Sequence, residues 1–302
     1  MKAKKPVRRR LDTTHAALLE AAAAVPVRLA HPEGLRLVLV GCGGTGSWLA
    51  PAIVRLARAW HEDLGWSVAV TFVDPDLVEA RNTFRQNFCA AEVGQPKAEA
   101  LAIRYSSAWG VPITARPTPF KSEVLRGPSY GTTHILLGCV DNGAARSSLH
   151  AALDGLSHHG TPRVWWIDAG NTRAGGQVLV GSARERRDLR YAFTIPGLCT
   201  ALPSPGWQRP ELLETTPEEA AGDDLDCTAL AIQHSQSLTV NQIMAAHIAD
   251  VLNRLVSGEL RTYAHHVTLN AGTVSSRFIT PESIARLTRS RVTSLSRPRP
   301  AR

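Results

Sequence analysis

Long apolar runs are absent from this sequence of 302 residues. No stretch of apolar residues reaches the ~18 that a membrane-spanning helix requires. Residues 1–10 are basic and no apolar segment follows them, so they do not fit a secretory signal. We therefore expect a soluble, cytoplasmic protein that does not enter a membrane.

Cysteine is scarce, and its spacing is unsuited to a structural metal site. The five cysteines are Cys42, Cys89, Cys139, Cys199 and Cys227, and no two of them form a C-x-x-C pair. A tetrathiolate zinc site needs such pairs, so we expect no zinc and only free thiols. The eleven histidines show no metal-ligand spacing, and we expect the adjacent pairs 158–159 and 265–266 to lie at the surface.

The net charge of +8 is concentrated at the two ends of the chain. Twelve of the 34 basic residues lie in residues 1–10 and 286–302, so the remaining 22 are opposed by 26 acidic residues and the body is slightly acidic. Neither tail contains an aromatic residue that could stack on a base. This argues against nucleic-acid contact through the tails and favours two solvated segments.

Short apolar runs alternate with helical patterns along most of the chain. We expect strands at 35–40, 68–73, 113–116, 134–140, 164–169 and 177–180, and helices at 14–25, 48–60, 97–107, 144–157 and 238–255. Residues 267–269 and 275–279 suggest a closing hairpin. This order predicts an α/β fold with a Rossmann-like, doubly wound, mostly parallel sheet.

The domain organisation follows from breaks in this pattern. We expect a basic tail and a helix in residues 1–34, one main domain over 35–285, and a basic disordered tail in 286–302. Residues 184–226 are rich in proline, arginine and acidic residues and show little periodicity. We interpret them as a long crossover or lid.

A glycine loop stands between the first strand and the helix after it. It contains Gly41, Gly43, Gly44 and Gly46. Such a loop makes a tight turn and presents backbone amides to a phosphate at a helix N-terminus. It fits NAD, FAD and ATP alike. Asp74 ends the second strand, where a carboxylate can accept hydrogen bonds from ribose hydroxyls.

Three charged residues indicate phosphate chemistry. Arg85 and Lys97 can neutralise charge that builds on a polyphosphate, and Asp141 can hold Mg²⁺. All three follow carboxyl ends of expected strands, where ligands bind in such sheets. A nicotinamide-dependent oxidoreductase would use the glycine loop but leave this cluster idle. A non-catalytic nucleotide-binding scaffold is the other alternative.

Five runs together resemble the ThiF/MoeB/ubiquitin-activating superfamily: GCGGTGS (41–47), VDPDLV (73–78), NTFRQ (82–86), VGQPK (93–97) and CVDN (139–142). The resemblance implies ATP-dependent adenylation of the C-terminal carboxylate of a small ubiquitin-like protein by a homodimer. It assigns Asp74 to the ribose, Asn82, Arg85 and Lys97 to the phosphates, with Gln86 beside them, and Asp141 to Mg²⁺. The run from Asp168 through Asn171 to Gly176 resembles the family's substrate-tail crevice.

The later half of the chain resembles the PRTRC-system ThiF-like proteins of bacterial mobile elements, through Asp226-Cys227 and Val240-Asn241-Gln242. That group implies a ubiquitin-like partner, a JAB-type peptidase and a plasmid-encoded complex. The chain lacks the family's N-terminal R-x-x-R-Q segment and its zinc-binding cysteine pairs. If a thioester follows adenylation, the candidate thiols are Cys227, at the start of a helix, and then Cys199; an inert role for both is the alternative.

Overall fold

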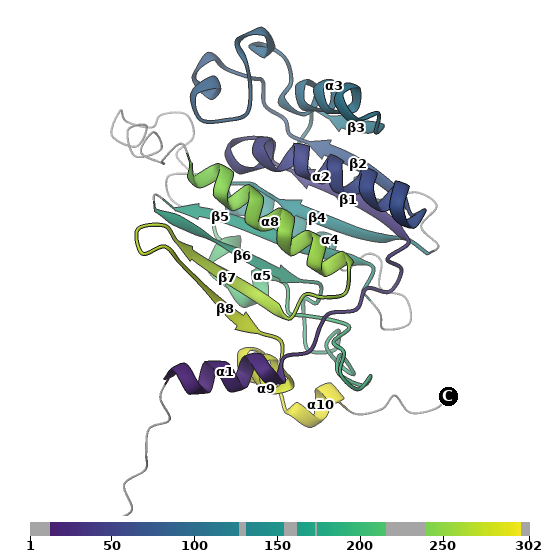
Figure 1. The fold of residues 1–302 in the computed structure, drawn as a ribbon, viewed down its shortest axis with the longest axis vertical. Helices are drawn as coiled ribbons and strands as arrows, with labels where there is room; N and C mark the ends of the chain where they lie inside the picture. Colours follow the sequence, from purple (N-terminus) through teal and green to yellow (C-terminus); the bar gives the residue numbers. More distant parts are fainter. Residues whose placement is uncertain (1–12, 127–130, 154–161, 173, 216–238, 297–302) are drawn as a thin grey trace, which may run out of the picture.

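An eight-stranded sheet organises the part of the chain that the computed structural model describes, residues 13–126, 131–153, 162–172, 174–215 and 239–296 (Figure 1). The strands are β1 (Gly34–Val40), β2 (Ser67–Val73), β3 (Ile113–Arg116), β4 (Thr133–Gly138), β5 (Val164–Thr172), β6 (Gly175–Gly181), β7 (Thr262–Thr268) and β8 (Thr273–Phe278). Their order is β3-β2-β1-β4-β5-β6-β7-β8. The strands from β3 to β5 pair in parallel, and β6, β7 and β8 continue the sheet antiparallel. The predicted Rossmann-like, mostly parallel α/β fold is confirmed.

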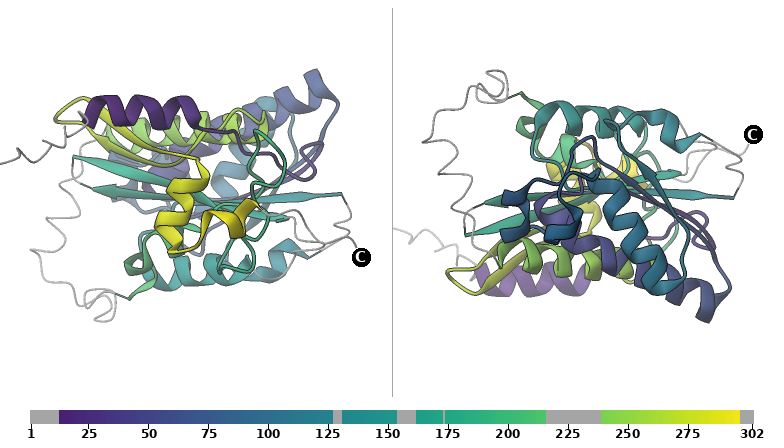
Figure 2. Two further views of the ribbon diagram at one scale, coloured as in Figure 1. Left: turned by 90° about the horizontal axis from the view of Figure 1, so that it is seen from below. Right: turned by 90° about the horizontal axis from the view of Figure 1, so that it is seen from above.

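Helices cover both faces of this sheet (Figure 2). On one face lie α2 (Gly44–Leu64), α3 (Lys97–Trp109) and α8 (Val240–Val256), and on the other lie α4 (Gly143–Ala152) and the short α5 (Pro205–Gln208). Near the β8 end of the sheet lie α1 (Thr13–Ala23), α9 (Pro281–Thr288) and α10 (Val292–Ser296). Short 3-10 helices η1 (Ala80–Phe84), η2 (Ala90–Glu92), η3 (Ser122–Leu125) and η4 (Pro210–Leu213) lie in the connections.

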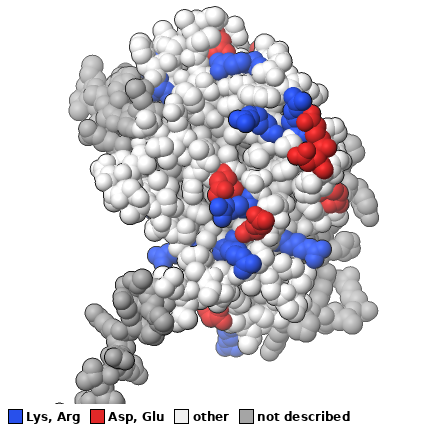
Figure 3. All heavy atoms as spheres, viewed as in Figure 1, with Lys and Arg blue, Asp and Glu red and all other residues white. Residues whose placement is uncertain are grey.

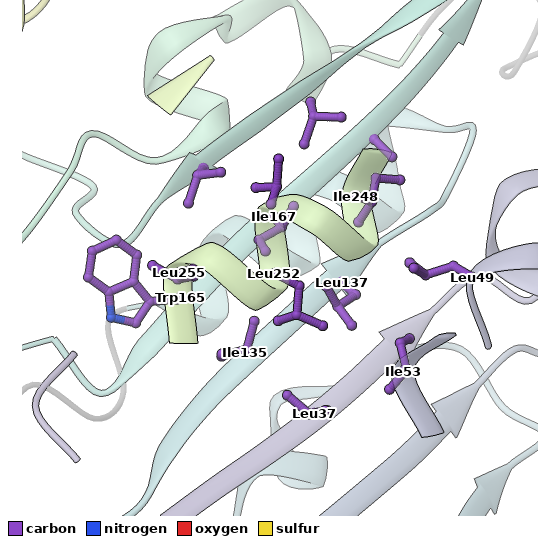
Figure 4. Close-up of a cluster of buried hydrophobic side chains, with 14 of the residues drawn as sticks. Leu37, Leu49, Ile53, Ile135, Leu137, Trp165, Ile167, Ile248, Leu252 and Leu255 are labelled. Atoms are coloured by element: carbon purple, nitrogen blue, oxygen red, sulfur yellow. The ribbon is translucent and has the colours of Figure 1, made fainter. Parts of the chain in front are cut away.

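The core forms because successive strand residues point to opposite faces. Leu37 of β1 packs in the cluster beneath α2 and α8, whereas the next residue, Val38, packs in the cluster that contains α4. Figure 4 shows the larger cluster, in which Leu37, Ile135 and Trp165 of three strands meet Leu252 of α8. Trp165 and Trp166 are both fully buried, on opposite faces, which confirms that they belong to the core.

The last two strands extend beyond the predicted hairpin. β7 and β8 pair from Thr262 with Phe278 to Thr268 with Thr273. His265 is buried, and its two ring nitrogens lie within hydrogen-bond distance of the Thr262 and Ser276 hydroxyls at 3.0 and 3.3 Å. The prediction that the 265–266 pair lies at the surface is therefore wrong for His265, because a half-buried sheet turns alternate residues inward.

Two segments without helix or strand periodicity nevertheless pack into the fold. In the described part of the expected crossover, residues 184–215, Cys199 and Leu202 are fully buried. Residues 216–226 lie outside the described residues. The expected C-terminal tail also differs, since α9 and α10 carry the structure to residue 296 and Leu295 is 2% exposed. The body thus extends further than the boundary at 285.

Charges of both signs are interspersed over the described residues on the face shown in Figure 3. Among the helices that the structure describes, none has the length and apolar character needed to cross a membrane.

Candidate active site

A cavity of about 1070 Å³ lies at the carboxyl ends of the parallel strands. Its wall includes the ends of β1, β2 and β5 and the residues that follow β4. The chain runs outward from β1 through β2 to β3 and then returns to β4 on the other side of β1. Ligands of doubly wound sheets bind where the strand order reverses in this way. The cavity therefore occupies the position that the fold reserves for a ligand.

The glycine loop forms one wall of this cavity. Gly41 has a φ of 89°, and a Cβ at Gly46 would lie 1.8 Å from the Gly41 carbonyl oxygen. The turn is thus tight enough that only glycine fits at these two positions. Gly43 and Gly44 line the cavity at the N-terminus of α2, where backbone amides and the helix dipole favour an anion.

Asp74 holds this loop in place. Its Oδ2 accepts a hydrogen bond from the Cys42 amide at 2.6 Å, and its Oδ1 accepts one from the Asp76 amide at 2.8 Å. Burial raises the pKa of the Asp74 carboxyl, and the Lys97 charge opposes that rise. Asp74 also lines the cavity, so the predicted ribose contact would use the remaining lone pairs of a carboxylate already fixed by backbone.

The predicted phosphate-binding residues converge on the same cavity, with one exception. Arg85, Gln86 and Lys97 line it. Lys97 begins α3, is buried, and its Nζ lies 2.7 Å from the Asp76 Oδ2. Gln86 Oε1 is buried without a hydrogen-bond partner in the described part of the chain. A buried polar atom at a cavity wall is satisfied when a ligand supplies its partner.

Asn82 is the exception. Its Oδ1 accepts a hydrogen bond from the Glu79 amide at 2.8 Å, which caps η1, and the residue does not belong to the cavity lining. Its carbonyl oxygen accepts hydrogen bonds from the amides of Arg85 and Gln86 at 3.3 and 2.8 Å. Asn82 therefore fixes the backbone that presents Arg85 and Gln86, and its phosphate contact stays a prediction.

Asp141 lies in the loop between β4 and α4 and lines the cavity with an exposed side chain. Sequence reasoning missed the residue that secures this loop, Arg146. Its Nη2 donates to the Val140 carbonyl at 2.6 Å and its Nε lies 3.3 Å from Asp168 Oδ1. Burial raises the pKa of the Asp168 carboxyl to about 6, against the lowering effect of Arg146. The only local signal was an arginine one helical turn after Asn142.

The described residues contain no cluster of three or more His, Cys, Asp or Glu side chains that could hold a metal ion. This arrangement fits Mg²⁺, which is commonly held by one or two carboxylates together with substrate phosphates and water. Asp141 supplies one such carboxylate.

A second polar group closes the far end of the cavity, and sequence reasoning missed its geometry. Asn171 Nδ2 donates to Asn241 Oδ1 at 2.7 Å and also to Thr45 Oγ1, whose hydroxyl donates to Asn241 Oδ1 at 3.3 Å. All three residues line the cavity. Thr45 and Asn241 are 196 positions apart, so no local pattern indicates their contact.

The two thiols proposed for a thioester have different outcomes. Cys199 is fully buried, its Sγ donates to the Ala201 carbonyl at 3.2 Å, and burial raises the pKa of the thiol to about 12. It does not line the cavity, so its prediction as a nucleophile is wrong: an inaccessible, protonated thiol does not attack. Cys227 lies outside the described residues.

Comparison with known proteins agrees with this architecture. The structure is similar to that of PaaA, with a TM-score of 0.51 and 18% identity, over 82% of this chain and 64% of that one. It is also similar to E. coli MccB solved with AMPCPP and MccA (TM-score 0.50, 11% identity, 87% and 66% coverage) and with N-formylated MccA (TM-score 0.50, 12% identity, 87% and 67% coverage). The chain thus spans less than two thirds of PaaA. No curated protein gives a significant match.

The sequence itself carries the more specific relationship. The ThiF family model matches residues 29–280, from the segment before β1 to the end of β8. That range contains the glycine loop, both cavity cations and Asp141. The chain belongs to the ThiF family.

Proposed function

We propose that this chain adenylates a carboxylate with ATP, and that its substrate is the C-terminus of a small ubiquitin-like protein. The observation that carries this proposal is the convergence of Arg85, Lys97 and Asp141 on the cavity that the glycine loop lines. Membership of the ThiF family and the similarity to MccB, solved with AMPCPP and MccA, support it.

In the proposed reaction a carboxylate oxygen of the substrate attacks the α-phosphorus of ATP. The bond from that phosphorus to the bridging oxygen breaks, and pyrophosphate leaves. Arg85 and Lys97 stabilise the charge on the phosphates, with Lys97 exchanging its contact to Asp76 for one to the nucleotide. No general base is needed, because a carboxylate is already ionised at neutral pH. Mg²⁺ held by Asp141 would add Lewis-acid neutralisation of the phosphate charge.

The test is ATP–pyrophosphate exchange with purified chain and a ubiquitin-like protein encoded beside it. We expect Asp141→Ala and Lys97→Ala to reduce exchange at least ~100-fold, a typical loss for a group that stabilises the transition state. Asp63→Ala, which changes an exposed aspartate of α2, is the matched control and keeps wild-type exchange. Unchanged exchange in Asp141→Ala would show that the mechanism is wrong.

Calorimetry separates this proposal from the two alternatives. Binding of ATP–Mg²⁺ but not NAD is expected, whereas a nicotinamide-dependent oxidoreductase would show the reverse. A scaffold without catalytic activity would bind nucleotide yet give no exchange with any carboxylate.

A thioester to Cys227 is the further step that we propose to test. The thiolate would attack the acyl carbon of the adenylate and release AMP. Non-reducing gels of chain, ATP–Mg²⁺ and partner should show a reductant-sensitive adduct that Cys227→Ala abolishes and Cys199→Ala preserves. Strong exchange without any adduct would mean that the enzyme stops at the adenylate.

A further inference from the structure

Asn171, Asn241 and Thr45 form what we term the amide clasp. Asn171 ends β5 on one side of the cavity, Asn241 begins α8 on the other, and Thr45 stands in the first turn of α2. Asn241 is 1% exposed and Thr45 6%. A Cβ at Gly44 would lie 3.0 Å from Asn241 Nδ2, so the clasp adjoins the glycine loop.

The clasp leaves one acceptor and one donor unused. Asn171 Oδ1 and Asn241 Nδ2 are buried and have no hydrogen-bond partner among the residues that the structure describes. If both side-chain amides were flipped, Asn171 Oδ1 would accept from Thr45 and Asn241, and Asn171 Nδ2 and Asn241 Oδ1 would be the unused atoms. Either orientation therefore offers one donor and one acceptor, and a buried pair of that kind calls for a ligand with the complementary pair.

The surroundings of the clasp narrow the chemistry of that ligand. The cavity continues from Asn171 past Thr172, Gln177 and Thr268, which are uncharged. Burial, assisted by the charges of Arg209 and Arg277, lowers the pKa of His266 in the same wall, so this side chain is neutral at neutral pH. The charged side chains Asp74, Arg85, Lys97 and Asp141 lie at the nucleotide end instead. An uncharged hydrogen-bonding chain suits this wall better than a second phosphate does.

We infer that the amide clasp binds a backbone amide of the substrate's C-terminal tail and thereby positions the carboxylate beside the glycine loop. In an extended peptide the N–H and C=O of one residue point to the same side, which matches a donor and an acceptor on touching side chains. Asn171 and Asn241 are thus positioning and specificity residues. The inference rests on the proposed function, because it takes the cavity to be the entry of a peptide carboxylate.

The experiment uses the full chain and a defined probe, N-acetylglycylglycine, with its two ester analogues in which one peptide N–H is replaced by oxygen. Binding is followed by calorimetry and by the ¹⁵N side-chain signal of Asn241, assigned from its loss in Asn241→Asp. We expect one ester to bind about tenfold more weakly than the amide, since it leaves a buried acceptor unpaired. The amide should shift the Asn241 signal.

Asn241→Asp keeps the shape of the side chain and the contacts from Asn171 and Thr45 but offers acceptors only. It should abolish the preference for amide over ester, and Asn171→Ala should do the same. Asn253→Asp, the same change at an exposed position of α8, should retain the preference. Equal binding of the amide and both esters, an unchanged preference in Asn241→Asp, or no binding of any probe would overturn the inference.

Binding without exchange distinguishes the two proposals. A preference for the amide in a chain that exchanges no pyrophosphate would retain the clasp and reject adenylation. Exchange with a ubiquitin-like protein but no amide preference would retain adenylation and reject the clasp.

Discussion

Gly46 and Gly43 belong to the same loop, yet an added methyl group would meet different surroundings at the two positions. At Gly46 it would lie 1.8 Å from a backbone oxygen, whereas at Gly43 the nearest atom is Gln86 Nε2 at 3.9 Å. We expect Gly46→Ala to lower the free energy of unfolding by about 3 kcal/mol and to abolish ATP binding, because rigid backbone must move. Thermal melts and calorimetry check this.

Gly43→Ala is the matched comparison. It should melt close to the wild type and lose ATP affinity only, since its methyl group would stand in the cavity wall. Equal melting temperatures for Gly46→Ala and the wild type would contradict the tight turn described for the loop.

Asp168 should make stability depend on pH. Its folded pKa of about 6 exceeds the ordinary value of 3.8, so between those values the folded chain holds a proton that the unfolded chain has released. This term of the free energy of unfolding therefore falls as the pH rises from about 4 to about 6 and is constant above that. The fall should be on the order of 2–3 kcal/mol.

Urea unfolding of the wild type and Asp168→Asn across this range measures the effect as a difference between two curves. The difference should change between about pH 4 and about pH 6 and then level off. Asp63→Asn, at an exposed aspartate, should give a constant difference. A constant difference for Asp168→Asn would show that the Asp168 pKa is not raised.

Single residues also show where sequence reasoning succeeds. Asp74 and Lys97 were predictable because each stands beside a local signal, the end of a strand and the start of a helix. Asn241 could not be placed, because its role depends on contacts with Thr45 and Asn171 that only the folded chain creates. Cys199 misled because a short sequence match says nothing about burial.

At the scale of elements, α10 shows how a basic composition can hide a packed helix. Leu295 is 2% exposed, and its carbonyl accepts a hydrogen bond from the Phe193 amide at 3.0 Å. We expect Leu295→Ala to lower the free energy of unfolding by about 2–3 kcal/mol through the cavity it leaves. Val292→Ala in the same helix, at a residue 37% exposed, should cost much less. Equal effects in urea unfolding would mean that α10 does not pack.

The strands and helices of the parallel half were largely predictable, since buried strands read as short apolar runs. The errors lie where packing is set by partners distant in sequence. The Val27 amide donates to the Leu260 carbonyl and the Arg28 amide donates to Cys199, so the segment before β1 is held by residues more than a hundred positions away. No periodicity reports such a contact.

For the whole molecule, we expect a homodimer. Phe84 is 78% exposed, and Leu77 and Val93, on the same connection between β2 and α3, are also exposed. Large exposed apolar side chains beside a site indicate an interface. Light scattering should give a mass of about 65 kDa, twice that of the chain, as expected for the commonest closed symmetry. A second copy on this face would lie beside Arg85.

Phe84→Ser should shift the mass to that of the 32.6 kDa chain while the fold persists. Ile103→Ser, at another exposed apolar residue on α3, should leave the dimer intact. A wild-type monomer at micromolar concentration would show that the site is complete within one chain.

The contact between Thr45 and Asn241 also has a consequence for biosynthesis. The glycine loop leaves the ribosome early, but the residue that packs against Gly44 follows 196 positions after Thr45. At ordinary rates of translation roughly 10–40 s separate the two. During that interval the nascent chain has the phosphate loop without the wall opposite it. Activation of a carboxylate is therefore restricted to chains whose synthesis has passed α8, and truncated products would not release reactive adenylates.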